Sequence, residues 1–568
     1  MHHHLTLRAK LIIMLSVMAS LFLVALDQTI IATAIGKIVE QFNAFDSLSW
    51  VFTAYLVTTT ITVPIAGKLS DQFGRRIMLL IGVAIFTIGS LSSGLSGNIT
   101  QLIMWRALQG IGGGIITANA FTIVGDLFAA RERGKWQGLI GAVFGLSSVV
   151  GPLLGGWLTD GQHLLGLVSD WRWTFFINVP IGIIAFILIF VYSPAFRHAN
   201  KPSIDYLGAA VLALGLGTLI FAVDNTETVF AGLLSSTGMS VGVLKTIMFG
   251  IVTVLVALFV MIERRAKQPI VPLHFFENRN FVLIMTVATL FGAAFMGSIL
   301  YLTQFNQQVF GATPTQSGLM LLPMIGGIML SSIGAGQIIS RIGKYKIFMQ
   351  IGFVVATIAM FFLATLTPES GYGYEAIIMA ALGLGMGVAM PVINLAVQNE
   401  FEQSEIGAAT SSSQLFRSLG STIGTAVFGA MLTAGIVSHL GDIQHSAYIQ
   451  TLKKSPAASK IGNFSDANTI LNLNMPDTKS LVTSSAQKSF AAIPQSARSA
   501  VQKDFTAQQD QFANTVTHAF STSLQRIFLI AAGFMVAATL AVFAIKEKTL
   551  NRAKPGETPS EEQSDLEP

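Results

Sequence analysis

The chain has 568 residues, of which 52% are hydrophobic and 11% are charged, with a mean hydropathy of +0.64 and a formal net charge of +5. Soluble domains carry about a quarter charged residues, so this composition excludes an ordinary soluble protein and indicates a membrane protein. The sequence contains no cysteine, which excludes disulfides, cysteine-ligated metals and thiol catalysis. Because the positive charge is spread over short loops, it does not indicate a nucleic-acid partner.

Apolar runs of about 20 residues recur along the chain, and an α-helix of that length crosses a hydrocarbon layer about 30 Å thick. The alternating pattern of a membrane β-barrel is absent. The pattern predicts transmembrane helices near residues 11–35, 48–67, 77–96, 101–124, 136–159, 172–193, 204–222, 244–262, 280–302, 316–340, 347–366, 375–398, 412–438 and 524–545. An even number of spans places both termini on the same side.

The distribution of lysine and arginine sets the orientation of these spans. The short loops on the side opposite to the termini hold only Lys37, Arg172 and Lys245, whereas the loops on the side of the termini hold many more basic residues. Since cytoplasmic loops carry the excess of basic residues, both termini are predicted to be cytoplasmic.

Two segments lack apolar runs. Residues 439–523 are rich in Ser, Ala, Gln, Lys and Asn, and they are predicted to lie outside. Their stretch SARSAVQKDFTAQQDQFANTVTHAF keeps a helical spacing of apolar residues, so we expect an outer helical cap that is partly flexible, with a disordered insertion as the alternative. The acidic, proline-containing residues 549–568 are predicted to form a disordered tail.

The first predicted helix contains one acidic residue, Asp27, within LDQTIIATAI (26–35). At 1.5 Å per residue, Asp27 lies ~24 Å from the inner face, and Arg106 within WRALQGIGGG (105–114) lies ~22 Å from the same face. Ionisable groups at this depth are costly unless they face a cavity or a partner. Asp27 is therefore the candidate proton carrier, because a changing contact with Arg106 would load and release a proton. A fixed structural ion pair is the alternative, since the sequence does not determine which helix faces meet.

A charged stretch, GKLSDQFGRR (67–76), follows the second predicted helix. Helix N-termini carry partial positive charge, so Asp71 can sit against the start of the thirteenth predicted helix, TSSSQLFR (410–417). This arrangement predicts a cytoplasmic gate, and a basic loop that only sets topology is the alternative. The predicted gate residues are Gly67, Asp71, Gly74, Arg75, Arg76 and Arg417. The role of Arg417 stays open between gate, anion contact and packing.

The stretch GQIISRIGKYK (336–346) repeats the spacing of the gate stretch, with Ser340 in the place of Asp71. We interpret the repeat as two related halves separated by two extra helices, because transporters are commonly built from such repeats; a chance match is the alternative. The predicted division is an N-terminal six-helix half at 1–200, two additional helices at 201–270, a C-terminal six-helix half at 271–548 that includes 439–523, and the tail 549–568.

The fifth predicted helix contains GLSSVVGPLLGGW (145–157). Its glycines let neighbouring helices approach closely, and Pro152 bends the helix, which suits a moving contact. The motif residues are Gly145, Gly151, Pro152, Gly155 and Gly156. Ordinary packing of small residues is an equally good alternative.

Together, these four stretches resemble the 14-helix drug:proton antiporter branch of the major facilitator superfamily, over nearly the whole chain up to about residue 546. The resemblance implies an all-α integral membrane protein with the major facilitator fold, two six-helix halves plus two additional central helices. It also implies coupling roles for Asp27 and Arg106, a latch at Asp71 when the cavity faces outward, and efflux through the motif of the fifth helix. The implied location is the cytoplasmic membrane of a bacterium.

We therefore expect a proton-coupled secondary active efflux transporter that exports lipophilic, often cationic, toxic compounds by alternating access. An exporter of a specific native metabolite, lipid or peptide is the alternative. An ATP-driven pump or an enzyme is disfavoured, because the sequence lacks a G-x-x-x-x-G-K-[ST] phosphate loop and an evident nucleophile-and-base cluster. A receptor that senses its ligand without transport is a further alternative, against which the paired gate motifs argue.

The candidate substrate cavity consists of polar or aromatic positions inside predicted spans. They are Tyr55, Gln109, Asn119, Phe144, Asn178, Gln304, Asn394, Gln398 and Phe416. Aromatic rings attract cations, which fits a lipophilic cationic substrate. The expected partners are small amphipathic substrates, protons and membrane lipid, with a monomeric protein, no nucleic acid, no metal and no cofactor beyond protons as the coupling ion.

Overall fold

The computed structural model describes residues 6–42, 48–159, 163–164, 167–193, 205–223, 226–312, 314–402, 405–438, 443–453, 464, 467–474, 476–490 and 494–550. Within these ranges, fourteen helices are long and apolar enough to cross a membrane. The predicted all-α membrane fold is therefore confirmed. The single sheet of the described part is a hairpin of two-residue strands, β1 (His163–Leu164) and β2 (Leu167–Val168).

The first group of helices, which we call the N-terminal half, runs from α1 to α7. Its members are α1 (Leu7–Phe42), α2 (Leu48–Phe73), α3 (Arg75–Gly94), α4 (Ile99–Leu127), α5 (Ala130–Thr159), α6 (Trp173–Phe176) and α7 (Asn178–Tyr192). Helix α2 continues through Phe73, so most of the predicted loop GKLSDQFGRR is helical. The break falls at Gly74, whose φ of 93° is a conformation that favours glycine.

Four helices follow before the second group. They are α8 (Tyr206–Val223), α9 (Thr226–Val229), α10 (Ala231–Thr237) and α11 (Val241–Glu263). Helices α8 and α11 pack against each other, and α8 also contacts α2. Most side chains of α11 are exposed, as expected for a helix that faces lipid on several sides.

The second group, which we call the C-terminal half, comprises α12 to α17 and the end of α23. The elements after α11 are η2 (Leu273–Glu277), α12 (Arg279–Val309), α13 (Pro314–Met320), α14 (Leu322–Ile342), α15 (Lys346–Leu363), α16 (Tyr372–Gln398), α17 (Ile406–Val437), α19 (Ala447–Lys453), α21 (Ala467–Asn474), α22 (Pro476–Phe490) and α23 (Gln495–Ala544). Helix α14 ends at Gly343, whose φ of 79° repeats the glycine break seen at Gly74.

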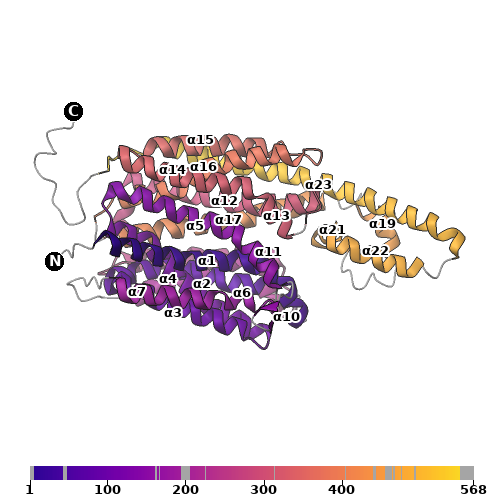
Figure 1. The fold of residues 1–568 in the computed structure, drawn as a ribbon, viewed down its shortest axis with the longest axis horizontal. Coiled ribbons are helices and arrows are strands. Elements are labelled where there is room, and N and C mark those ends of the chain that lie inside the picture. Colours follow the sequence, from indigo (N-terminus) through magenta and orange to yellow (C-terminus); the bar gives the residue numbers. More distant parts are fainter. Residues whose placement is uncertain are drawn as a thin grey trace, which may run out of the picture.

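A helical subdomain projects beyond the transmembrane bundle at the end opposite to the start of α1 (Figure 1). It contains α19, α21, α22 and the first part of α23, and its own apolar core includes Tyr448, Phe505 and Phe512. Helix α23 has 50 residues, about 75 Å at 1.5 Å per residue, and continues from this subdomain into the bundle without a break. The boundary predicted at residue 524 therefore lies inside one helix.

Helix α1 begins and α23 ends at the same end of the bundle, which we call the terminal end (Figure 1). The chain after α23 is held there, because the amide of Leu550 donates to the carbonyl of Gly343, and Lys548 pairs with Glu400 at 2.7 Å. Residues 549 and 550, predicted to belong to a disordered tail, are therefore part of the described structure, and residues 551–568 lie outside the described residues.

Candidate functional site

The carboxylate of Asp27 on α1 is fully buried and accepts hydrogen bonds from two other helices. Arg106 on α4 donates to Oδ2 at 2.5 Å, Gln109 on α4 donates to Oδ1 at 2.8 Å, and Asn178 on α7 donates to Oδ1 at 3.2 Å. The predicted meeting of Asp27 and Arg106 at one depth is therefore a direct contact. Gln109 and Asn178, predicted to line the cavity, are instead partners of the carboxylate.

Arg106 is 1% exposed, and its guanidinium makes further contacts with the N-terminal half. It donates to the carbonyl of Val51 at 3.3 Å and to Oε1 of Gln109 at 2.8 Å. Its centre lies 4.4 Å from the ring centroid of Tyr55, within the range of a cation–π interaction. A buried ion pair of this kind is stable only when additional hydrogen bonds satisfy both charges, and here they do.

A run of glycines explains how α4 brings Arg106 this close to its neighbours. Methyl groups built at Gly110 and Gly114 would overlap α2, and one at Gly112 would overlap the backbone of α3 at Phe86. Close helix contact of this type is a general use of small residues in membrane proteins. The stretch WRALQGIGGG therefore combines a charge with the packing surface that buries it.

Helix α5 lies against α1 and also against the C-terminal half. Close to Asp27, the hydroxyl of Thr29 donates to the carbonyl of Ser147 on α5 at 3.0 Å. A methyl group at Gly151 would overlap Thr29, and Pro152 packs against Gly318 on α13. Gly145, in the same motif, faces Met329 on α14. The motif thus forms a packed connection between the helix that carries Asp27 and the second half.

The charged stretch at the end of α2 forms a cluster at the terminal end. Arg75 pairs with Asp71 and donates to the hydroxyl of Ser70, and its Nε donates to Oδ2 of Asp126 on α4 at 2.7 Å. Asp126 was missed by the sequence reasoning. Its place in the last turn of α4, at the same membrane level as Arg75, is a signal that would have found it.

Asp71 also touches the C-terminal half, at a place that differs from the prediction. Helix α17 begins at Ile406 rather than near residue 412, and a methyl group built at Gly407 would overlap the carboxylate of Asp71. The carboxylate therefore lies against the first turn of α17, where backbone N–H groups lack helical partners and the helix dipole favours an anion. The expected capping stretch, TSSSQLFR, lies further along the helix.

Further contacts join the two halves at the terminal end. Gln398 on α16, predicted to line the cavity, donates to the carbonyl of Phe121 on α4 at 3.0 Å. Ser340, which replaces Asp71 in the repeated motif, donates to the carbonyl of Arg131 at 2.7 Å. A methyl group at Gly67 would overlap Ser411 on α17. The terminal end is therefore closed in this conformation.

Two predicted gate residues lie elsewhere. Arg76 donates to the carbonyl of Phe190 on α7 and does not join the Arg75 cluster. Arg417 is the twelfth residue of α17, about 16 Å along the helix, whereas the predicted span placed it five residues (417 − 412) after the helix start. Its guanidinium donates to Oε1 of Gln414 at 2.5 Å, and no carboxylate of the described residues pairs with it.

The remaining cavity candidates make separate contacts and do not form one cluster. Asn394 on α16 accepts a hydrogen bond from Gln414 and so extends the polar chain that ends at Arg417. Asn119 bonds to its own helix at the carbonyl of Ile115, and Phe144 stacks on Phe121. Phe416 packs near Phe276, and Gln304 on α12 is half-buried. In the motif of the fifth helix, the carbonyls of Gly155 and Gly156 accept hydrogen bonds from the hydroxyl of Thr159 on the same helix, α5.

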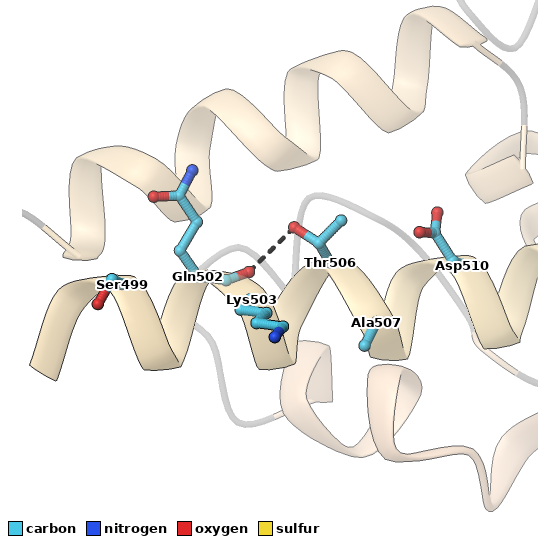
Figure 2. A pocket seen from close by; sticks show the side chains of 6 residues that line it. All are labelled: Ser499, Gln502, Lys503, Thr506, Ala507 and Asp510. Carbon is cyan, nitrogen blue, oxygen red and sulfur yellow. Dashed lines mark hydrogen bonds between the residues drawn. The ribbon is translucent and has the colours of Figure 1, made fainter.

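A shallow hollow of about 520 Å³ lies on the projecting part of α23, far along the helix from the transmembrane site. Figure 2 shows its lining side chains, which follow one face of the helix, with the hydroxyl of Thr506 bonded to the carbonyl of Gln502. The hollow is open, and its lining includes the exposed side chains of Lys503 and Asp510. These residues form a solvated helix surface rather than an enclosed binding site.

Comparison with known proteins places this geometry in a family. A family model described as "Major Facilitator Superfamily" matches residues 17–425. The chain is 36% identical to the multidrug transporter protein MdtP of Bacillus subtilis (strain 168) over 73% of this chain and 74% of that protein. It is 34% identical to multidrug resistance protein 3 of the same organism, over 76% of this chain and 81% of that protein.

Solved structures give the same fold. The human organic anion transporter MFSD10 has a TM-score of 0.56 and 14% identity, covering 93% of this chain and 99% of that one. The proton:xylose symporter XylE also has a TM-score of 0.56 and 14% identity, covering 95% and 97%. The family and these relatives are transporters rather than enzymes. The chain therefore belongs to the major facilitator superfamily, as its sequence motifs predicted.

Proposed function

We propose that this transporter is a proton-coupled exporter of lipophilic, often cationic, toxic compounds that works by alternating access. The observation that carries the proposal is the buried Asp27 carboxylate, whose two oxygens accept from Arg106, Gln109 and Asn178. The multidrug names of the two Bacillus subtilis relatives support the substrate class. We further propose that a single chain works without a cofactor, with protons as the coupling ion.

The hydrogen bonds around Asp27 link proton uptake to helix movement. Oδ1 accepts from both Gln109 and Asn178, whereas Oδ2 accepts from Arg106, so a proton would bind to the remaining lone pair of Oδ2. Protonation removes the negative charge that attracts the guanidinium of Arg106, which loosens the contact between α1 and α4. Helix α5 packs against α1 at Thr29, beside Asp27, and also against α13 and α14. A movement of α1 would therefore be transmitted to the C-terminal half through α5.

The position of Asp27 fits proton entry from the side opposite to the termini. It lies 20 residues (27 − 7) after the start of α1, about 30 Å from the terminal end, and Arg106 lies 7 residues (106 − 99) after the start of α4, about 10 Å from the other end. Basic residues concentrate in the loops at the terminal end, so we assign that end to the cytoplasm of a bacterial cell.

In this proposal, the cluster of Asp71, Arg75 and Asp126 is the cytoplasmic gate. Asp71 lies against the first turn of α17 while the terminal end is closed, and the favourable interaction with the helix N-terminus stabilises that state. Substrate would enter from the cytoplasm after Asp71 separates from Gly407, and it would leave on the other side after the gate closes again.

A second candidate function is favoured by Arg417. Its guanidinium has five N–H donors, and Gln414 is the acceptor that the described residues provide. A cation inside a membrane span is expensive unless it faces water or a ligand. A substrate with a carboxylate or phosphate group would supply the missing acceptor, as an exporter of a native acidic metabolite or lipid would need.

Inverted membrane vesicles distinguish these functions. With an acidic interior, addition of tetraphenylphosphonium to wild-type vesicles should release protons, detected by a fluorescent pH probe. Asp27→Asn should abolish the signal, and Asp170→Asn, an exposed carboxylate paired with Arg172, should leave it unchanged. A response to an amphipathic carboxylic acid that disappears in Arg417→Gln would establish the second candidate. Proton release that persists in Asp27→Asn would contradict the proposed coupling.

A further inference from the structure

Glu375, in the first turn of α16, is a second fully buried carboxyl group, and the coupling scheme above does not use it. Its neighbour is Asn306 on α12, which is also fully buried. With its amide nitrogen toward Glu375, Asn306 donates to both carboxyl oxygens at 2.9 Å. The site lies in the C-terminal half, at the end of the bundle opposite to the terminal end.

No basic side chain of the described residues pairs with Glu375. Most basic groups of the helices that pack against α16 lie near the terminal end. They are Arg341 on α14, Lys346 on α15, Arg279 on α12 and the basic residues in the first turns of α5. The basic group of α17 is Arg417, which lies about 16 Å along that helix. Tyr372 is the titratable group within electrostatic reach. An ionised carboxylate buried without a cation is far more costly than the neutral acid, so Glu375 gains by binding a proton.

The Asn306 amide suits both protonation states of this carboxyl. With the nitrogen turned inward it donates to the carboxylate, and when one carboxyl oxygen binds a proton the nitrogen still donates to the other oxygen. The N-terminal turn of α16 adds a favourable dipole for the ionised form. Neither state breaks an ion pair among the described residues, which distinguishes this site from the Asp27–Arg106 pair.

A surface groove lies near Glu375. Tyr372 is three residues earlier, so both side chains lie on the same face of α16. Tyr372 lines an open groove of about 480 Å³ together with Phe310, Ala312 and Gln316, and its hydroxyl donates to the carbonyl of Met320. Glu375 is thus one helical turn along α16 from an open surface groove at the outer end of the bundle.

The end of α12 is also held in position from outside. Two residues after Asn306, Gln308 donates to the carbonyl of Leu471, and Asn474 donates to the side chain of Gln308. Both partners belong to the projecting subdomain, on α21. The subdomain therefore anchors the helix turn that presents the amide to Glu375.

We propose that Glu375 is a second proton-binding carboxyl, which exchanges protons with the outer side through the groove at Tyr372. The inference rests on the proposed proton coupling and adds to it one proton carried by the C-terminal half. The N-terminal half would bind its proton at Asp27 by opening an ion pair, whereas the C-terminal half would bind its proton at Glu375 without losing a cation.

Proton counting on purified protein tests this inference. Tetraphenylphosphonium is added to the detergent-solubilised transporter in weak buffer at neutral pH, and a pH dye reports the protons released. This measurement counts protons released on binding and needs no transport cycle, unlike the vesicle assay, in which loss of Asp27 stops transport. We therefore expect Glu375→Gln and Asp27→Asn each to lower the release by about half, one proton of two, and the double variant to abolish it. Glu369→Gln is the matched control, because Glu369 is an exposed glutamate near the same end of the bundle.

The outcomes separate the two proposals. Release that is unchanged in Glu375→Gln but lost in Asp27→Asn overturns the second site and leaves the proposed function intact. If the wild-type protein releases no protons, the proposed coupling fails, and infrared difference spectra then decide the site itself. A protonated-carboxyl band at neutral pH that is absent in Glu375→Gln and present in Glu369→Gln supports proton binding at Glu375; identical spectra of Glu375→Gln and wild type overturn it.

Discussion

The two halves of the transporter bury carboxyl groups in different ways. In the N-terminal half, Asp27 is matched by a guanidinium and two amides, so charge, hydrogen bonds and burial are satisfied together. In the C-terminal half, Glu375 has the amide of Asn306 as a partner and no salt bridge among the described residues. Arg417 on α17 donates a hydrogen bond to the side chain of Gln414. One half thus holds a closed ion pair, and the other holds two separate ionisable groups.

This difference shows what a repeated fold leaves open. The two gate stretches repeat their glycine breaks, at Gly74 and Gly343, because both halves need the same sharp turn between helices. The polar groups are not repeated: Asp71 reaches a helix N-terminus, whereas Ser340 makes one bond to a backbone carbonyl. Backbone geometry is shared between the halves, and the placement of charge is specific to each.

The largest expected effect comes from opening the closed pair. Arg106→Ala leaves Asp27 buried without its cation, so we expect the free energy of unfolding in detergent to fall by about 3–5 kcal/mol. Glu375→Gln keeps the shape of the side chain and an amide partner, so the expected change is below about 1 kcal/mol. Denaturant titration followed by tryptophan fluorescence measures both. Losses of equal size would show that the halves do not differ in how their charge is stabilised.

A smaller effect is expected at the gate. Gly407→Ala adds a methyl group where the Asp71 carboxylate lies, and overpacking of about 1–3 kcal/mol should shift the population away from the closed terminal end by roughly tenfold. Because the chain has no cysteine, a single cysteine at Ser340 reports this opening through its rate of maleimide labelling.

The matched control for this experiment is Gly326→Ala on α14, because no atom lies within 4 Å of the added methyl group. Its labelling rate should equal that of the parent single-cysteine protein. Equal labelling of the Gly407→Ala and Gly326→Ala proteins would argue against a latch at this contact.

The smallest effect concerns the last residue of the repeat, where Arg76 corresponds to Tyr345. Burial raises the pKa of Tyr345 from 10.0 to about 12. Between these pH values the Tyr345 hydroxyl keeps its proton in the folded protein but loses it in the unfolded chain. The contribution of this burial to the free energy of unfolding is therefore complete below pH 10 and is lost as the pH rises toward 12. In Tyr345→Phe, the free energy of unfolding measured by denaturant titration should decrease less between pH 10 and 12 than in the wild type. An equal decrease in both proteins would contradict the assignment.

The sequence by itself determined the number and order of the membrane helices, because each apolar run must match the thickness of the bilayer. It also placed Asp27 and Arg106 deep inside their helices, since the rise per residue of a helix is fixed, although α1 begins four residues earlier than predicted (11 − 7). The repeated spacing of 67–76 and 336–346 was visible in the sequence, and the chain breaks at the matching glycines of the two stretches, Gly74 and Gly343. These features depend on one helix or one turn at a time.

Only the tertiary structure decided which side chains meet. The rotation of a helix about its axis is set by its neighbours, so Gln109 and Asn178 could not be assigned to the Asp27 carboxylate from spacing alone. For the same reason, Gln398 joins the closed terminal end, and Arg76 turns toward α7. Glu375 stood at the start of a predicted span, where the sequence is compatible with exposure; packing against α12 buries it and gives it Asn306 as a partner.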